Sequence, residues 1–401
     1  MSDKLPKLRF YNYSEEWERV NVKELSSEIY GGGTPKTSIK EYWLGEIPWI
    51  QSSDLNIDEL HNVVPSKYIT DEAVKESAAK LVPRGSIAIV TRVGVGKLSV
   101  IPYDYCTSQD FLSLSSLKVD INFGAYSLYK LLDKEKNNLQ GTSIKGITKR
   151  DLLMKKIAIS RSDIEQQKIG EFFKQLDDRI ALQQSHVEQL KQSKQGFLQK
   201  MFPKDGESVP EVRFDGFSEE WKNEKAKSIF KSISEKNQST LPVLSASQEK
   251  GMIYRNDVGI DIKYDMKSTK NYKRVKPGQF VIHLRSFQGG FAYSSIEGIT
   301  SPAYTVIDFN NSEDYSPLFW RIFLSSKKFI KRLETVTYGI RDGRSISYRD
   351  FSTLKLKFPS VEEQQKIGEF FKQLDDLIAK NERELELLQE TKKGFLQKMF
   401  V

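Results

Sequence analysis

The sequence predicts an α+β protein with two strand-rich domains, each followed by a long helix, and with an internal two-fold duplication. The first observation is that fourteen residues, Glu165–Asp178, return unchanged as Glu363–Asp376. The second is that seven more, Gly196–Phe202, return as Gly394–Phe400 at the same offset of 198 residues. A repeat of this period, about half of the 401-residue chain, indicates two copies of one structural unit.

Weaker matches extend the duplication into the regions before each repeated segment. They pair Pro6–Phe10 with Pro210–Phe214, Gly85–Arg92 with Gly278–Arg285, and Ile147–Leu152 with Ile346–Phe351. The order is therefore a variable domain, a repeated segment, a second variable domain and a second repeated segment. We predict the boundaries 1–160, 161–204, 205–359 and 360–401 for these four parts.

The repeated segments are predicted to be long helices that pair with each other. Apolar residues recur in alternating steps of four and three, which is typical of a coiled-coil seam. Two polar residues interrupt each copy at matching places, Gln183 with Asn381 and Lys194 with Lys392. The alternative is two amphipathic helices that each pack on their own domain. The predicted seam consists of Ile169, Phe173, Leu176, Ile180, Val187, Leu190, Phe197, Ile367, Phe371, Leu374, Ile378, Leu385, Leu388 and Phe395.

The two variable domains carry more strand signals than helix signals. Short β-branched or aromatic runs bounded by Gly, Pro, Asn and Ser predict strands at 86–90, 280–282, 304–307 and 354–358. The best helix candidates within the domains are 71–78 and 317–324. These patterns predict mixed domains with irregular, strand-rich cores.

The composition limits the class of protein. Lys and Arg number 62 against 54 Asp and Glu, a net charge of +8 that is compatible with a polyanionic partner. One cysteine, Cys106, and three histidines far apart in sequence argue against a disulfide framework or a Cys/His metal site. No run is long and apolar enough to span a bilayer and the N-terminus lacks a signal-peptide pattern. We therefore expect a cytoplasmic protein without a membrane partner.

Catalytic motifs are few. Gly31–Pro35 is not followed by the Gly-Lys-Ser/Thr of a phosphate-binding loop, and we interpret it as a loop that lets the backbone approach a ligand. Val93–Leu98 fails the same pattern at both ends and predicts a glycine-rich turn that presents Arg92 and Lys97. The acidic-x-Lys spacing of Asp261 with Lys263 and of Asp265 with Lys267 leaves a metal-dependent nuclease as an alternative.

Basic residues interleaved with aromatic and amide side chains indicate nucleic-acid binding, because such side chains neutralise phosphates and read base edges. Surface charge alone explains many of them, but Arg92/Arg285 and Arg150/Arg349 recur in both domains. The candidate DNA-binding residues are Gln51, Ser52, Ser53, Arg92, Lys97, Gln109, Lys145, Lys149, Arg150, Ser245, Ser247, Gln248, Lys273, Arg285, Ser286, Gln288, Tyr304, Arg341, Arg344, Tyr348 and Arg349.

Three strings in the chain resemble a known family. Gly31–Pro35, Ile47–Ile50 with Asp54-Leu55, and above all Glu165–Ile169 with its repeat are similar to the specificity subunit of type I restriction-modification systems. The second domain departs from this pattern, because it has Leu241–Ser245 in place of Ile47–Gln51 and lacks Gly-Gly-Gly-Thr-Pro. Such a departure is expected if the two domains read different DNA sequences.

The resemblance implies a non-catalytic reader of double-stranded DNA, with each variable domain a target-recognition domain for one half of a bipartite, asymmetric site. The two helices would pair antiparallel, set the spacer and dock two methylation subunits. Restriction/translocase subunits would complete the complex. S-adenosylmethionine, ATP and magnesium would belong to those partners, and no cofactor or metal to this chain. A coiled-coil scaffold without a role in nucleic-acid binding remains a further alternative.

Overall fold

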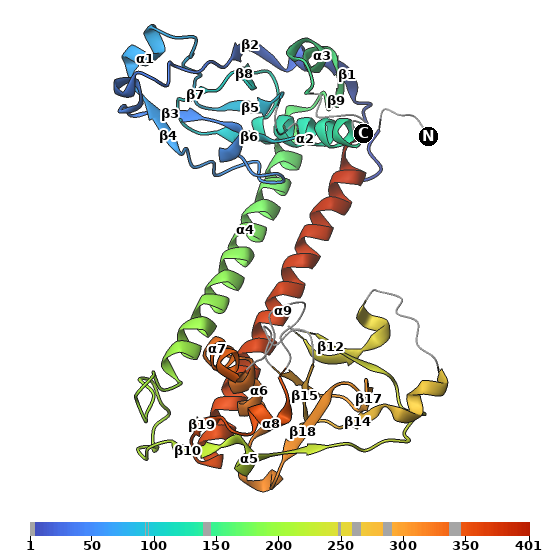
Figure 1. The fold of residues 1–401 in the computed structure, drawn as a ribbon. Helices are drawn as coiled ribbons and strands as arrows, with labels where there is room; N and C mark the ends of the chain where they lie inside the picture. The colour runs from blue at the N-terminus through green and yellow to red at the C-terminus, as the bar shows by residue number, and fades with distance from the viewer. Residues whose placement is uncertain are drawn as a thin grey trace. The chain divides into compact units, whose positions relative to one another are not determined.

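The structure is a computed structural model that describes residues 5–92, 94, 96–138, 146–247, 250–258, 266–283, 291–336 and 346–401. The chain divides into two compact units, and Figure 1 labels their elements. Unit 1 contains residues 1–185 and 382–401, and unit 2 contains residues 186–381. The helices α4 (Asp163–Lys200) and α9 (Val361–Met399) each contribute one part to unit 1 and the other part to unit 2.

Serine side chains begin both long helices. The hydroxyl of Ser162 accepts a hydrogen bond from the Glu165 amide at 3.3 Å, and Ser360 does the same for the Glu363 amide at 3.4 Å. A side-chain acceptor at this place satisfies one of the free amides of the first turn. After α4, Pro203 and Gly206 break the pattern, and Gly206 has a φ of +90°, which favours glycine.

In unit 1, β1 (Glu18–Asn21) pairs antiparallel with β9 (Lys156–Ile159). A four-stranded antiparallel sheet has the order β2-β8-β5-β6, and β3 lies between β4 and β7 in a second sheet. Helices α1 (Asp71–Lys75), α2 (Ile121–Asn138) and α3 (Lys149–Met154) complete the unit. The bounds of the strands in the two sheets are Ser26–Gly31 (β2), Ile47–Ile50 (β3), Lys67–Ile69 (β4), Ser86–Val90 (β5), Leu98–Ile101 (β6), Cys106–Thr107 (β7) and Phe111–Leu117 (β8).

Unit 2 repeats this topology with different residues. The pair β10–β19 corresponds to β1–β9, and the four-stranded order β11-β18-β15-β16 corresponds to β2-β8-β5-β6. Two further antiparallel pairs, the hairpin β12–β13 and the pair β14–β17, complete the strands. The bounds are Lys222–Lys225 (β10), Ala226–Ile229 (α5), Phe230–Ile233 (β11), Leu244–Ser247 (β12), Gly251–Tyr254 (β13), Lys273–Val275 (β14), Phe280–Ile282 (β15), Ala292–Tyr293 (β16), Gly298–Thr300 (β17), Thr305–Phe309 (β18), Pro317–Ser325 (α6), Lys327–Leu333 (α7), Tyr348–Phe351 (α8) and Lys355–Phe358 (β19).

Each hydrophobic core includes the end of a helix that comes from far along the chain. In unit 1 the core around Phe123 and Phe173 contains Met399 and Phe400 from the end of α9. In unit 2 the core around Phe319 contains Met201, the residue after α4. The start of one helix therefore lies with the end of the other in each unit, so the helices pair antiparallel.

The predicted fold class is confirmed: two strand-rich α+β domains, long repeated helices and an internal duplication. The predicted strands at 86–90, 280–282, 304–307 and 354–358 correspond to β5, β15, β18 and β19. The prediction missed α2, an 18-residue helix whose face is almost entirely buried from Phe123 to Leu128. The first half of α2 is mostly apolar and its second half mostly polar, so the polar residues do not recur evenly along the helix and its periodicity is hard to recognise. Within the described ranges, no helix combines the length and apolar character needed to cross a membrane.

Candidate nucleic-acid interface and its helical frame

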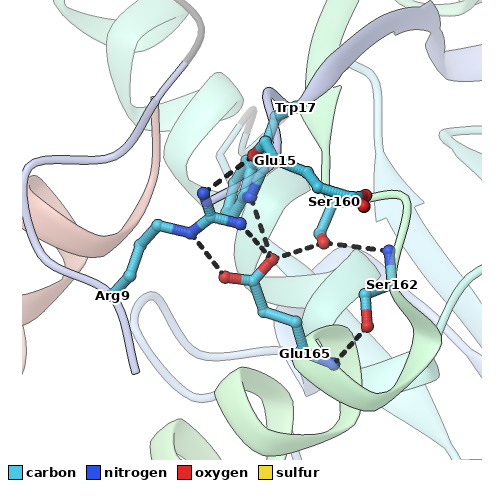
Figure 2. Close-up of polar contacts among 6 residues, drawn as sticks. All are labelled: Arg9, Glu15, Trp17, Ser160, Ser162 and Glu165. Carbon is cyan, nitrogen blue, oxygen red and sulfur yellow. Dashed lines mark hydrogen bonds and ion pairs between the residues drawn. The ribbon is translucent and has the colours of Figure 1, made fainter. Parts of the chain in front are cut away.

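A buried carboxylate at the start of α4 anchors the first domain to the helix. The two Glu165 oxygens accept hydrogen bonds from Arg9 at 2.7 and 2.8 Å and from the indole of Trp17 at 3.2 Å (Figure 2). Ser160 donates a further short hydrogen bond to Glu165. Burial alone would raise the pKa of Glu165, but the hydrogen bonds and the charge of Arg9 outweigh it and hold the pKa below its usual value.

Unit 2 repeats the anchor in a simpler form. Arg213 donates two hydrogen bonds to Glu363, at 2.7 and 2.8 Å. The position of Ser160 is taken by Pro359, which has no hydroxyl, and the buried indole nitrogen of Trp221 has no hydrogen-bond partner among the described residues. The repeated ion pair is therefore the common part of the two anchors.

The neighbouring glutamine attaches the domain through backbone groups. Gln166 accepts a hydrogen bond from the Asp120 amide, before α2, and donates one to the Ser160 carbonyl at 2.7 Å. Gln364 likewise accepts from the Ser316 amide, before α6, and donates to the Pro359 carbonyl at 2.9 Å. The repeated glutamine thus attaches each domain at two backbone groups, and Gln364 also accepts a hydrogen bond from the Trp320 indole at 3.1 Å.

The repeated glycine allows a close helix contact. A Cβ atom at Gly170 would lie 2.4 Å from Oδ1 of Asp120 and 2.7 Å from the Phe123 amide nitrogen. A Cβ atom at Gly368 would lie 2.7 Å from both Leu318 Cβ and the Phe319 amide nitrogen. Only glycine permits α2 and α6 to begin this close to the long helices.

The predicted seam residues occupy the packed face of the helices. Thirteen of the fourteen are buried or half-buried, and Phe197 is the exception at 37% exposed. In unit 1, Phe172 packs edge-on against Phe395 with ring centroids 5.1 Å apart, and in unit 2 Phe197 packs in the same way against Phe370 at 5.0 Å. Four seam residues also belong to the cores of their own domains: Ile169, Phe173, Ile367 and Phe371. The two helices therefore pack against each other and also against their own domains.

The lysines that interrupt the seam make ion pairs between the helices. Lys392 lies 2.5 Å from Asp177, whose other oxygen accepts a hydrogen bond from Tyr126 at 2.7 Å. In unit 2, Lys194 lies 2.5 Å from Asp375, the repeat of Asp177. These contacts explain why charged residues lie within an apolar seam. The suggested role of Gln183 and Asn381 in register stays a prediction.

Six predicted DNA-binding residues of the first domain lie around one end of its sheets. Gln51, Ser52 and Ser53 follow β3, Arg92 follows β5, and Gln109 precedes β8. Lys97 donates from Nζ to the Ser52 carbonyl at 3.0 Å, and Gln109 accepts a hydrogen bond from Thr34. Strand β5 pairs antiparallel with β8, and the Ser108 amide donates to the Ile50 carbonyl at 3.0 Å, so these ends lie together at one edge of the unit. Arg150 is exposed on α3, beside the half-buried Lys149.

The glycine-rich segment 31–33 is needed for packing inside the protein. A Cβ atom at Gly32 would lie 1.9 Å from the Ser108 carbonyl oxygen, and one at Gly33 would lie 2.2 Å from the Ala78 carbonyl oxygen. The carbonyl of Gly33 also accepts a hydrogen bond from the Trp49 indole at 3.0 Å. Close approach of the chain to itself thus accounts for Gly32 and Gly33, whereas Gly31 lies beside Lys149.

In the second domain the candidates are less concentrated. Lys273 in β14 donates to the Tyr304 carbonyl at 2.6 Å, and burial together with Lys236 lowers the pKa of Lys273. Tyr348 donates from its hydroxyl to the Phe230 carbonyl at 2.6 Å, and Arg349 beside it is exposed. Ser245 and Ser247 are half-buried in β12. Lys145, Gln248, Arg285, Ser286, Gln288, Arg341 and Arg344 lie outside the described residues.

A shallow groove of about 550 Å³ lies on unit 1 between the N-terminal segment and α4, and we call it the repeated groove. Its lining is Phe10, Gln167, Lys168, Glu171, Phe172 and Gln175. The same residue types stand in unit 2 as Phe214, Gln365, Lys366, Glu369, Phe370 and Gln373.

The contacts that shape this groove also recur. Phe10 and Phe172 lie 6.1 Å apart between ring centroids in unit 1, and Phe214 and Phe370 lie 6.0 Å apart in unit 2. Lys168 lies 5.4 Å from the Tyr13 ring, as Lys366 lies 4.9 Å from that of Phe217. Both units therefore present the same kind of exposed surface.

The chemistry of the described residues offers few reactive groups. The part of the chain that the structure describes holds no cluster of three His, Cys, Asp or Glu side chains that could bind a metal. The nuclease alternative depends on Asp261, Lys263 and Asp265, which lie outside the described residues, and on Lys267, whose side chain is not described. Burial raises the pKa of the Cys106 thiol to about 12, which keeps it protonated near neutral pH.

Sequence reasoning missed the anchors and the ion pairs that hold the frame together. Arg9 and Arg213 stand in matching strings, as do Glu165 and Glu363, and Asp177 and Asp375 lie within the repeated segments. The presence of the same charged residue at matching positions of the two repeats therefore indicates that these residues make contacts. The sequence could not show which charges meet, because the partners are about 150 residues apart.

Comparison with known proteins agrees with this architecture. The model of the type I restriction modification DNA specificity domain matches twice, at residues 14–192 and 215–390. The MjaIX specificity subunit of Methanocaldococcus jannaschii is 31% identical over 174 residues, which cover 41% of this chain and 39% of that relative. The MjaX specificity subunit of the same organism is 24% identical over 412 residues, which cover 95% of this chain and 92% of that relative.

A solved structure has the same fold. The S subunit of a type I restriction-modification system from M. genitalium matches with a TM-score of 0.63 at 17% identity, over 99% of both chains. Since the two matches to the family model cover most of the sequence and coincide with the two structural repeats, the chain belongs to the type I restriction modification DNA specificity family and carries two such domains.

Proposed function

We propose that each domain of this specificity subunit binds one half of a bipartite, asymmetric site on double-stranded DNA. The observation that carries the proposal is that the two units share their helical frame but differ in the residues expected to contact DNA. The anchors and the strand order recur in both units, whereas most candidate contact residues differ, apart from the matched Arg92/Arg285 and Arg150/Arg349. A repeated frame with unlike faces suits two unlike half-sites at a fixed separation, as symmetric dimers suit palindromic ones.

The paired helices set the spacer between the half-sites in this proposal. Helix α4 runs from one unit into the other over 38 residues, and α9 over 39. A helix advances about 1.5 Å per residue, so in this proposal the number of helical residues between the domains determines the spacer.

The helical frame also docks two methylation subunits, one on each repeated groove. Four groove residues of α4, Gln167, Lys168, Glu171 and Gln175, are exposed, and so are their equivalents on α9. Exposed side chains contribute little to the fold of their own unit, so their identity in both copies suits two copies of one partner. The half-buried Phe172 supplies the apolar centre that such interfaces use, and the charges lie at its rim.

The reaction chemistry lies in the partner subunits under this proposal. Methylation subunits bind S-adenosylmethionine, and restriction/translocase subunits use ATP and magnesium. This chain selects the DNA sequence on which they act, in the cytoplasm. The basic balance of the chain, +8 overall, favours encounter with DNA.

The DNA assignment is tested by coexpressing the chain with its methylation subunits and mapping methylated adenines across the host genome. We expect methylation at a two-part sequence with a spacer of constant length. Methylation without a shared bipartite sequence, or none at all, would contradict the proposal. Cleavage of DNA by the purified chain with magnesium alone would favour the nuclease alternative.

The docking assignment is tested by charge reversal at exposed groove positions. Lys168→Glu and Lys366→Glu should each remove one methylation subunit, and the double variant should remove both. Native mass spectrometry of the assembled complex counts the subunits. Arg179→Glu, exposed on α4 outside the groove, is the matched control. Full assembly of the double variant would refute docking at this surface.

A further inference from the structure

Four segments of unit 1 converge beside the end of β2. A Cβ atom at Gly31 would lie 3.0 Å from Nζ of Lys149, at the start of α3. A Cβ atom at Gly146 would lie 2.6 Å from the Thr91 carbonyl oxygen and 3.0 Å from Cα of Arg92. The Thr91 amide donates to the Asp110 carbonyl at 2.8 Å, which adds the segment before β8. Backbone contacts therefore hold the region that carries Arg92 and Lys149.

This region holds two positive charges near one negative charge, that of Asp110. Among the described residues, neither Arg92 nor Lys149 forms an ion pair or a side-chain hydrogen bond. Burial and then the charge of Arg92 lower the pKa of Lys149. The charge of Asp110 opposes this shift, and Lys80 adds a smaller lowering effect. Two positive side chains that lie close together and are partly shielded from solvent repel each other, and an anion bound between them relieves this repulsion.

The second domain provides an internal comparison. The position of Lys149 is taken by Tyr348, whose hydroxyl is bonded to the Phe230 carbonyl at 2.6 Å. Counted from the first residue of β2 and of β11, the position of Gly31 is taken by Glu235, which pairs with Arg274 at 2.6 Å. Among the described residues, this corner of the fold thus contains a paired carboxylate in unit 2 and cations without an ion pair in unit 1. Arg285, which matches Arg92, lies outside the described residues.

From this contrast we infer that Arg92 and Lys149 form a phosphate-binding site that holds one backbone phosphate of the DNA, and that the second domain, with Tyr348 in place of Lys149, lacks this pair of cations. The inference rests on the proposed function and assigns these two residues to positioning rather than to reading bases. Gly31 contributes because any larger side chain would fill the space beside the Lys149 ammonium group. A contact of this kind fixes the register of the domain on the duplex and is the same for every sequence.

The test uses the assembled complex with the methylation subunits. Lys149→Gln and Arg92→Gln are each titrated with cognate and unrelated duplexes at several salt concentrations. Loss of one phosphate contact should lower the slope of log affinity against log salt concentration by about 0.9. At 0.15 M salt this corresponds to an affinity about fivefold lower. Both duplexes should lose affinity by the same factor. Lys118→Gln, exposed at the far end of β8, is the control and should change neither quantity.

A second measurement identifies the phosphate. Duplexes with one neutral methylphosphonate at each backbone position of the half-site are bound to the wild-type complex and to Lys149→Gln. One position should weaken the wild type about fivefold and leave the variant unaffected, because the contact has already been lost. Additive losses at every position would overturn the inference, as would a variant that loses affinity for cognate DNA alone.

The two failures are distinguishable. If the wild-type complex has no preference for any bipartite duplex, the proposed function fails. If the wild type has that preference and both glutamine variants retain its salt slope, only the phosphate site is refuted.

Discussion

The ion pairs between the helices give a matched pair of substitutions. Lys392 and Lys194 occupy equivalent positions in the repeat and meet equivalent aspartates at 2.5 Å. Their surroundings differ, because the side chains of Lys392 and Asp177 are 9% and 15% exposed, whereas those of Lys194 and Asp375 are 31% and 29% exposed. Methionine keeps the apolar stem of lysine and removes its charge, so Lys392→Met and Lys194→Met compare a buried pair with a more exposed one. Asp375 also pairs with Arg321 at 3.5 Å, which further reduces the expected effect of Lys194→Met.

The expected magnitudes follow from that exposure. Removing one partner of a buried pair costs about 3–5 kcal/mol because the other charge stays desolvated. Asp177 retains its hydrogen bond from Tyr126, which places Lys392→Met near the lower end of that range. A half-exposed pair is worth about 1 kcal/mol or less, and this applies to Lys194→Met.

Hydrogen exchange read by mass spectrometry resolves the two effects. Lys392→Met should lower the protection of α4 residues 163–185 about 100-fold, which corresponds to about 3 kcal/mol, and leave residues 186–200 unchanged. Lys194→Met should reduce protection about fivefold or less, and only in residues 186–200. Asp177→Asn in the Lys392→Met background should restore most of the loss, because no buried charge then lacks a partner.

Equal losses from the two lysine substitutions would refute the reasoning. That result would mean that the difference in burial has no energetic effect. Failure of Asp177→Asn to restore protection would show instead that the lysine stem, rather than its charge, stabilises the helix pair.

Four further substitutions test the frame. Gly170→Ala should destabilise unit 1 by about 1–3 kcal/mol through overpacking. Gly196→Ala, where no atom lies within 4 Å of the added Cβ, should instead stabilise its helix by about 0.5–1 kcal/mol. Thermal unfolding compares the two variants, and equal effects would contradict the close contact at Gly170. Glu165→Gln should abolish a pH dependence: because the folded pKa of Glu165 lies below 4.5, its stabilisation is fully present above that pH and is lost as the pH falls through the folded value. Acid titrations that coincide for the two proteins would rule this out. Leu176→Asp should place a charge at a site 8% exposed and separate the helices of unit 1; unchanged helix protection would oppose the seam assignment.

Residues with a local or periodic signal could be predicted from the sequence. The seam is periodic, so Leu176 and Ile378 were assigned to the packed face without knowledge of the fold. The repeat itself located the frame, since identity over fourteen residues indicates shared structure.

The remaining features depend on contacts between distant segments. Nothing near Arg9 in the sequence indicates that it meets Glu165, and nothing near Lys392 indicates Asp177. The candidate DNA contacts are the weakest part for the same reason. Tyr348 matched the pattern of a basic and aromatic patch, yet its hydroxyl is bonded inside the domain. Composition identifies side chains that suit DNA, but only the fold determines which of them remain available.

The division of the chain into units also has a consequence for the order of folding. Unit 2 is one continuous stretch, residues 186–381, whereas unit 1 needs residues 382–401 to complete its core. At ribosomal rates of 5–20 residues per second, synthesis of the intervening stretch takes roughly 10–40 s. Unit 2 can fold in that interval while Trp17 and Phe123 still lack the ring of Phe400, which packs against both. The first domain to be synthesised is therefore the last to be completed, and during that interval it exposes apolar surface that chaperones bind.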